Sequence, residues 1–127
     1  MLTRISVLHL PTLLKVDAAV SLVAGLVFVL GAGLLASATS LPEGLLLFAG
    51  CVFLAVGAFL AVISAPSRLQ RRAVMLVVVV SAVWVLASLG VMISDRIVPN
   101  ALGHALILLQ AAVVGCFATL EHLVLRA

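Results

Sequence analysis

Charged residues are scarce in this chain, and their scarcity excludes most soluble folds. Only 9% of its 127 residues are Asp, Glu, Lys or Arg, whereas 66% are hydrophobic and the mean hydropathy is +1.48. A soluble domain carries roughly 25% charged residues, most of them on its surface. The outward-facing side chains of this protein must therefore meet lipid.

Cysteine is also scarce, and the two that are present do not predict a disulfide. Cys51 and Cys116 fall at different depths of the apolar segments, about 12 Å apart at a rise of 1.5 Å per residue. A disulfide needs Cα atoms within about 7 Å, so we expect two separate buried thiols. No Gly-rich phosphate loop, nucleophile elbow or paired-cysteine motif occurs. The sequence thus predicts no metal site and no evident catalytic machinery, and it names no cofactor.

Long apolar stretches fill most of the chain. A membrane-spanning helix needs about 20 apolar residues, and four stretches meet this length: Val16–Ala36, Leu45–Ser64, Ala73–Ser94 and Leu102–Leu120. They predict one all-α domain over residues 1–127, an integral membrane four-helix bundle with short loops. We expect His9-Leu10-Pro11-Thr12 to break the chain before the first span, which leaves residues 1–14 as an interfacial segment.

The ends of the predicted helices carry capping signals. Ser40-Leu41-Pro42-Glu43 has the form of a capping box that opens the second span. Asn100 is placed to be the N-cap of the fourth. Ala36-Ser37-Ala38 has the form of a signal-peptidase site, but the apolar run before it exceeds the roughly 7–15 residues of a signal peptide. We therefore expect the first span to be retained.

The few basic residues are distributed asymmetrically, which predicts the orientation. Six of the seven flank one side of the predicted bundle, namely Arg4, Lys15, Arg68, Arg71, Arg72 and Arg126. Arg96 alone lies on the other side. Lys and Arg are enriched in cytoplasmic loops, so both termini are predicted to be cytoplasmic. The net charge of +3 then reflects topology, and because no basic surface with interleaved aromatic residues occurs, we expect no nucleic-acid partner.

Small residues form a stripe along the second predicted span. Its members are Gly50, Gly57, Ala61 and Ser64. Small side chains let helix backbones approach closely in lipid. The stripe predicts either packing within the bundle or assembly with a second copy or another membrane protein.

Ionisable residues gather at the predicted cytoplasmic end of the first and fourth spans. Asp17, Glu121 and His122 fall at similar depth, with Lys15 and Arg72 as basic candidates to pair with the acids. One interpretation is structural anchoring, with Glu121 paired to Lys15 or to the arginines between the second and third spans. The other is cation binding or proton relay, because ionisable residues within spans are functional candidates.

Polar and aromatic residues also occur near mid-membrane. Trp84 lies deep in the third span although tryptophan is enriched at membrane interfaces, and its indole N–H needs a partner there. Ser81 and Gln110 are the candidate partners, and Ser88 lies on the same face as Trp84. A contact between Trp84 and Gln110 would join two helices, whereas stacking of a ligand on Trp84 is the functional alternative.

Three segments resemble small bacterial four-helix inner-membrane proteins that are loosely DoxX-like. They are Leu14-Lys15-Val16-Asp17-Ala18, Ser81-Ala82-Val83-Trp84-Val85-Leu86-Ala87-Ser88 and the end of the fourth span around Glu121. The resemblance implies a bacterial inner membrane and no particular activity. Three functions stay open: a membrane interaction or accessory protein, an oligomeric transporter or channel subunit for a small solute or ion, and a cofactor-dependent membrane enzyme.

Overall fold

The computed structural model describes residues 2–65, 70–94 and 97–126, with side chains described for residues 10–65, 70–94 and 97–125. Arg68, Asp95 and Arg96 lie outside the described residues, as do the side chains of Arg4 and Arg126. The described chain forms five helices, which are α1 (Leu2–Leu30), α2 (Ala32–Thr39), α3 (Glu43–Ile63), α4 (Arg71–Ile93) and α5 (Ala101–Arg126). Residues Leu10–Leu30 of α1 and the helices α3, α4 and α5 are long and apolar enough to cross a membrane. The all-helical fold with four apolar spans is thereby confirmed.

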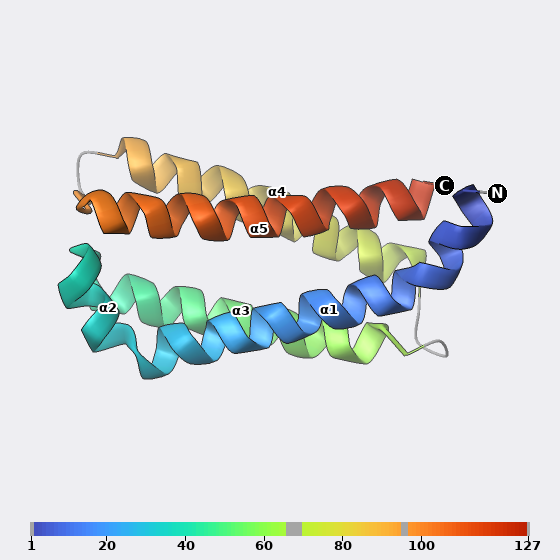
Figure 1. Ribbon diagram of the computed structural model, residues 1–127, viewed down its shortest axis with the longest axis horizontal. Helices are drawn as coiled ribbons and strands as arrows, with labels where there is room; N and C mark the ends of the chain where they lie inside the picture. The colour runs from blue at the N-terminus through green and yellow to red at the C-terminus, as the bar shows by residue number, and fades with distance from the viewer. Residues whose placement is uncertain (1, 66–69, 95–96, 127) are drawn as a thin grey trace.

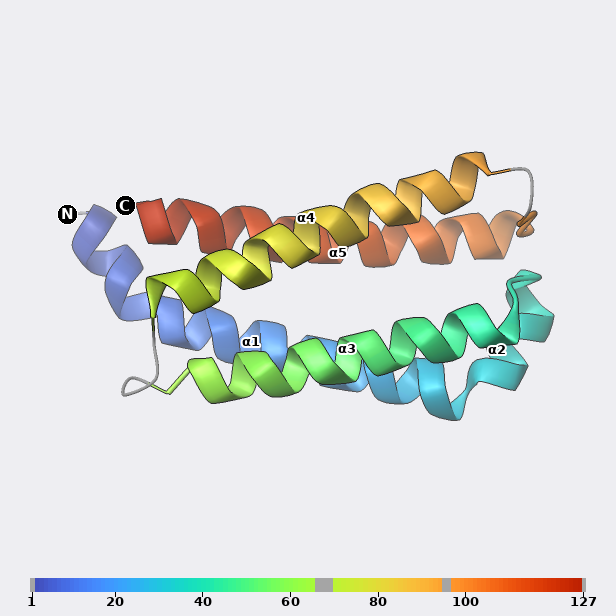
Figure 2. The ribbon, with the colours of Figure 1, turned by 180° about the vertical axis from the view of Figure 1, so that it is seen from behind.

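The helices are arranged as two pairs. α1 packs most extensively along α3, and α4 packs along α5, while contacts between α1 and α5 join the pairs. Both chain termini lie at one end of the bundle, which we call the terminal end (Figure 1). The short helix α2 lies at the opposite end, which we call the far end. The reverse view shows α4 crossing obliquely toward the first pair at the terminal end (Figure 2).

Glycines set the close approach of α1 to α3. A Cβ atom on Gly50 would lie 2.7 Å from Val29 and 3.0 Å from the carbonyl oxygen of Gly25, and one on Gly25 would lie 2.9 Å from the carbonyl oxygen of Gly50. A Cβ on Gly57 would lie 2.8 Å from Leu22. Only residues without a side chain fit at these positions. The packing stripe predicted from the sequence is therefore used within the chain, since Gly50, Gly57 and Ser64 are buried although Ala61 is exposed.

The first predicted span differs from the helix observed. α1 runs without a break through Pro11, so the break expected at His9–Thr12 is wrong. Pro lacks one backbone N–H and bends a helix without necessarily ending it, and Figure 1 shows α1 curving near its N-terminal end. The helix ends instead at Leu30, because Gly31 leaves the helical conformation with φ −101° and ψ 14° before α2 starts. Residues 32–36, expected in the span, belong to α2.

The expected capping box before α3 is also wrong. Ser40 is the C-cap of α2, with a left-handed φ of 60°, and its N–H donates to the carbonyl of Ala36. α3 starts at Glu43 after an extended Pro42, which makes no side-chain cap. The sequence motif is present, but α2 takes Ser40 to end its own last turn.

Asn100 closes the far end of the bundle. Its side-chain oxygen accepts a hydrogen bond from the Gly103 N–H at 2.9 Å, which is the N-cap expected from the sequence. Its side-chain amide donates to the Ala38 carbonyl at 2.8 Å, and its backbone N–H donates to the Thr39 carbonyl at 3.1 Å. The turn after α2 is thus tied to the start of α5.

The described core divides into two clusters, one near each end. The terminal-end cluster contains Leu10, Leu14, Ala18, Leu60, Ile63, Val74 and Val77. The far-end cluster contains Phe28, Ala32, Leu41, Leu46, Ala49, Phe53 and Ile107. Around both clusters, large apolar side chains are exposed on every long helix, up to 85% for Ile93. Such exposure fits a multi-pass membrane protein, whose outer surface is solvated by lipid.

The cysteines are free, as expected, but both are exposed rather than buried. Cys51 lies on α3 and Cys116 on α5. The expectation of buried thiols was wrong because a helix whose whole circumference is apolar gives no signal for which apolar residues face inward.

Candidate functional site

Trp84, Ser88 and Gln110 form a closed hydrogen-bonded group that we call the tryptophan–glutamine cluster. Trp84 Nε1 donates to Gln110 Oε1 at 2.7 Å, which is the contact between α4 and α5 expected from the sequence. Gln110 Nε2 donates to Ser88 Oγ at 2.8 Å and to the Ile107 carbonyl at 2.9 Å. Ser88 Oγ donates to the Trp84 carbonyl at 2.8 Å. Every side-chain polar atom of the cluster therefore has a partner.

A pocket with a volume of about 200 Å³ lies beside this cluster, between the two helix pairs. Its walls are almost wholly apolar, and its lining includes Phe28, Leu46, Phe48, Trp84, Ile107 and Gln110. Phe48 and Trp84 are stacked with their ring centroids 6.4 Å apart. The Phe48 side chain is 59% exposed, and Ala87 on α4 is also an exposed lining residue. The pocket thus reaches the outer surface between α3 and α4, which contact each other only sparsely.

The aromatic lining of this pocket was not foreseen from the sequence. Phe53 contacts both Phe28, at a ring-centroid distance of 5.6 Å, and Trp84, at 5.5 Å. Edge-to-face pairs of this kind stabilise by more than their buried area alone. The available signal was that all five phenylalanines of the chain lie in the apolar spans, as the single tryptophan does. Phenylalanine is common in apolar helices, so this signal is weak.

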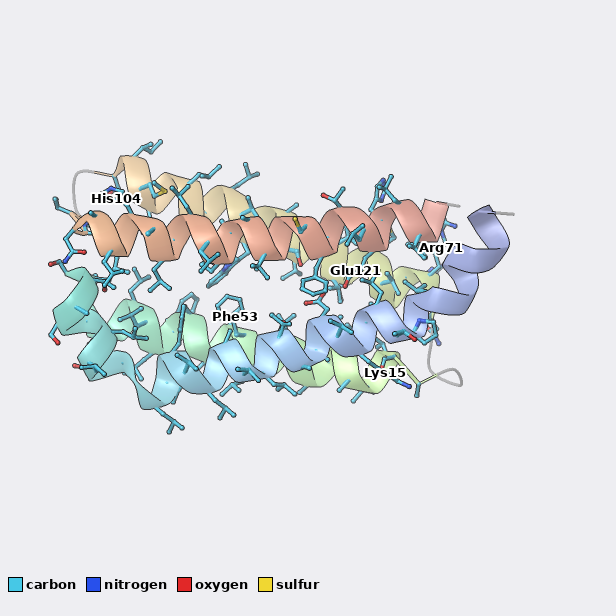
Figure 3. The ribbon with its side chains drawn as sticks, viewed as in Figure 1. Lys15, Phe53, Arg71, His104 and Glu121 are labelled. Carbon is cyan, nitrogen blue, oxygen red and sulfur yellow. The ribbon has the colours of Figure 1, made fainter. Side chains whose placement is uncertain are left out.

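Asp17 on α1 and Glu121 on α5 are brought together as an acid pair inside the terminal half of the bundle. Glu121 is fully buried, at 0% exposure, and Asp17 is 8% exposed. Asp17 is the acidic neighbour of Glu121. Figure 3 shows the Glu121 side chain between α5 and α1. Ser21, one helical turn after Asp17, donates its hydroxyl proton to Asp17 Oδ1 at 3.3 Å.

The basic residues expected to pair with these acids do not do so. Lys15 and Arg72 are exposed, and neither Glu121 carboxyl oxygen has a hydrogen-bond partner of acceptable geometry among the described residues. The Arg71 guanidinium instead donates to the Leu125 carbonyl at 3.4 Å. The expectation that Glu121 is paired with Lys15 or Arg72 is wrong. Lys15 is only two residues from Asp17, and such neighbours project from different sides of a helix.

His122 and Ser81 lie at the margins of these groups. His122 is half-buried, and its Nδ1 atom is buried without a hydrogen-bond partner among the described residues. Ser81 lines a cavity of about 30 Å³, whose wall also contains Asp17, Ser21 and Trp84. This small cavity lies between the acid pair and the tryptophan–glutamine cluster. The described side chains contain no group of three or more His, Cys, Asp and Glu residues arranged to hold a metal ion.

The bundle therefore contains an apolar pocket whose neighbouring polar atoms all have hydrogen-bond partners. Nearer the termini it contains a buried acid pair with no counter-charge among the described side chains. No family model, curated protein or solved structure matches the chain. The chemistry of these two places is accordingly the basis for any functional assignment.

Proposed function

We propose that the protein is a multi-pass membrane interaction or accessory protein that holds the acyl chain of a membrane lipid between its two helix pairs. The observation that supports this proposal is the pocket of about 200 Å³. An apolar cavity of roughly 150 Å³ in a protein interior stays dry and binds benzene or xenon. The pocket is therefore large enough to take part of a hydrocarbon chain.

The polar edge of the pocket supports an apolar occupant. Because the polar atoms of Trp84, Ser88 and Gln110 are already paired with one another or with backbone carbonyls, an occupant needs no hydrogen-bonding group to satisfy them. A polar solute would lose its own hydration in such a site without gaining partners. The opening beside Phe48 faces the surface at which lipid chains would lie.

The single tryptophan makes this proposal testable by fluorescence. We expect lipids with brominated acyl chains to quench Trp84 strongly in the wild-type protein, because Trp84 lines the pocket. Ala87→Phe, at a lining position, should displace the chain and reduce quenching. Ala82→Phe is the matched control, since Ala82 is an equally exposed alanine of α4 that does not line the pocket. Equal quenching in both variants would refute acyl-chain binding at this site.

The same proposal includes a location and an orientation. We place the protein in a bacterial inner membrane, in line with the resemblance to small four-helix proteins of that membrane, with both termini cytoplasmic. Six basic residues flank the side that carries the termini, and Arg96 alone flanks the other. Topology reporters fused after Ala127 and within the Ser40–Pro42 turn test the orientation. A reporter at Ala127 that is active only outside the cytoplasm would overturn it.

An accessory role also implies assembly with a second copy or with another membrane protein. Gly50 and Gly57 contact α1 and are not free for such assembly. A partner would have to pack against other faces, such as the open surface of α4 around Gly90, where an added Cβ atom would have no described neighbour within 4 Å. Native mass spectrometry after mild extraction would report bound lipid and partner subunits together.

A further inference from the structure

Glu121 is a buried acid that no basic side chain of the described fold pairs with. Its side chain is 0% exposed, and both carboxyl oxygens lack hydrogen-bond partners among the described residues. An unpaired carboxylate in an apolar interior is costly, and proteins neutralise such groups with a proton, a cation or a basic side chain. The group therefore requires a positive counterpart.

Among the side chains that the structure describes, the charged and titratable groups near Glu121 do not supply that counterpart; the side chains of Arg4, Arg68 and Arg126 lie outside them. On α1, Asp17 adds a second acid and Lys15 is exposed. On α4, Arg72 is exposed and Arg71 is occupied by the Leu125 carbonyl. On α3, the acid Glu43 lies at the far end, where that helix begins, and is remote from Glu121. On α5, the Nδ1 atom of His122 has no hydrogen-bond partner among the described residues.

The ligand atoms that Asp17, Ser21 and Glu121 offer are all oxygens. Asp17 and Glu121 contribute four carboxyl oxygens and Ser21 one hydroxyl, and these suit a hard cation rather than a thiolate- or imidazole-binding metal. Ca²⁺ takes six to eight oxygen ligands, and Mg²⁺ keeps several waters in an octahedral shell. Asp17 and Ser21 line a cavity of about 30 Å³, which is room for about one or two water molecules. The number of oxygen ligands and the room for water fall short of what Ca²⁺ and Mg²⁺ require, which favours a cation of single charge.

We propose that Asp17, Ser21 and Glu121 form a binding site for one monovalent cation, Na⁺ or H⁺, inside the terminal half of the bundle. Two carboxyl groups and a hydroxyl contribute the ligands, and a cavity of about 30 Å³ lies beside Asp17 and Ser21. The site is separate from the acyl-chain pocket and does not depend on it.

The first arm of the test measures Na⁺ with the full chain in detergent. Thermal unfolding is followed as NaCl replaces choline chloride at constant ionic strength, and binding predicts a saturable rise in the melting temperature of the wild-type protein. Glu121→Gln and Asp17→Asn should abolish the rise. Ser21→Ala, which removes one ligand and leaves both acids, should raise the half-saturating Na⁺ concentration several-fold. Glu43→Gln, at an exposed acid of the far end, should leave the response unchanged.

The second arm detects H⁺ by infrared spectroscopy. A proton at the site predicts a C=O stretching band of a protonated carboxyl group in Na⁺-free buffer that shifts on transfer to D₂O. The band should be lost in Glu121→Gln and altered in Ser21→Ala, but retained in Glu43→Gln. A Na⁺ response assigns the site to Na⁺, and an exchangeable band without a Na⁺ response assigns it to H⁺. A Na⁺ response that persists in Glu121→Gln, a half-saturating Na⁺ concentration that is unchanged in Ser21→Ala, or the absence of both a Na⁺ response and an exchangeable band overturns the proposal.

Discussion

The two buried polar groups of this bundle differ in whether their hydrogen-bonding atoms have partners. In the tryptophan–glutamine cluster, each donor meets an acceptor at 2.7–2.9 Å, so the cluster is complete within α4 and α5. In the acid pair, Ser21 donates to Asp17, but both Glu121 oxygens are left without a partner among the described residues. A closed network holds helices together, whereas an open one calls for something that the described chain does not supply.

This contrast separates the structural from the functional interpretation of polar residues in lipid. Gln110 and Trp84 need no ligand to explain their presence, because each satisfies the other. Glu121 has no such partner among the residues that the structure describes. Depth alone did not distinguish the two cases, since both groups lie within the apolar spans.

The largest expected effect comes from disturbing the frame that both groups share. Gly50→Leu would force α1 away from α3, because even a Cβ would lie 2.7 Å from Val29. Overpacking of a tight core typically costs about 1–3 kcal/mol, and a leucine against backbone should reach about 3 kcal/mol or more. The free energy of unfolding can be measured by SDS titration in mixed micelles. Gly90→Leu is the control, because its surroundings are open, and an equal loss there would show that the close approach is not the cause.

A smaller loss is expected when the closed network is opened. Gln110→Leu removes the acceptor of the Trp84 indole N–H and the donor to Ser88. A buried group left without a partner costs about 1–3 kcal/mol, so we expect a loss of about 2 kcal/mol in the same titration. An emission spectrum of Trp84 that does not change in this variant would contradict the assigned hydrogen bond.

The sequence predicted a contact correctly where a buried polar group had few residues that could serve as its partner. The contact between Trp84 and Gln110 was expected because an indole N–H deep in an apolar span needs an acceptor, and Gln110 is a rare polar residue at that depth. Asn100 was recognised as an N-cap for a similar reason. The number of spans followed directly from the length of each apolar stretch and the thickness of a bilayer.

The sequence-based predictions were wrong where the same residue is compatible with more than one local structure. Ser40 can open α3 or end α2, and in the structure it ends α2, with its N–H donating to the Ala36 carbonyl. Pro11 can break a helix or bend it. The pairing of Glu121 with Lys15 was inferred from similar depth, but the two side chains point in different directions, one into the bundle and the other outward. Rotation about a helix axis is poorly specified when every face of the helix is apolar.

Substitution in the acid pair should raise the free energy of unfolding, whereas Gln110→Leu should lower it. Glu121→Met replaces an unpaired buried acid with an apolar side chain of similar length, and replacing buried charges in this way is often neutral or stabilising. We expect the free energy of unfolding in Na⁺-free neutral buffer to rise by about 1 kcal/mol. A loss as large as that of Gln110→Leu would mean that Glu121 has a strong partner, and the contrast between the two groups would fail.

The smallest expected effect is the coupling energy between two residues of the same group, and it compares the tryptophan–glutamine cluster with the acid pair most directly. A double-mutant cycle of Trp84→Phe and Gln110→Leu isolates the hydrogen bond between them from other effects of each change. Hydrogen bonds between membrane helices contribute about 0.6 kcal/mol on average in such cycles, and we expect a favourable coupling of about that size. The matched cycle of Asp17→Asn and Glu121→Gln, in Na⁺-free buffer, should give a coupling of the opposite sign when both acids are ionised, because two carboxylates without a cation repel each other. Addition of Na⁺ should move only the second coupling if the acids bind it. A favourable coupling in both cycles would show that the two acids share a proton in Na⁺-free buffer.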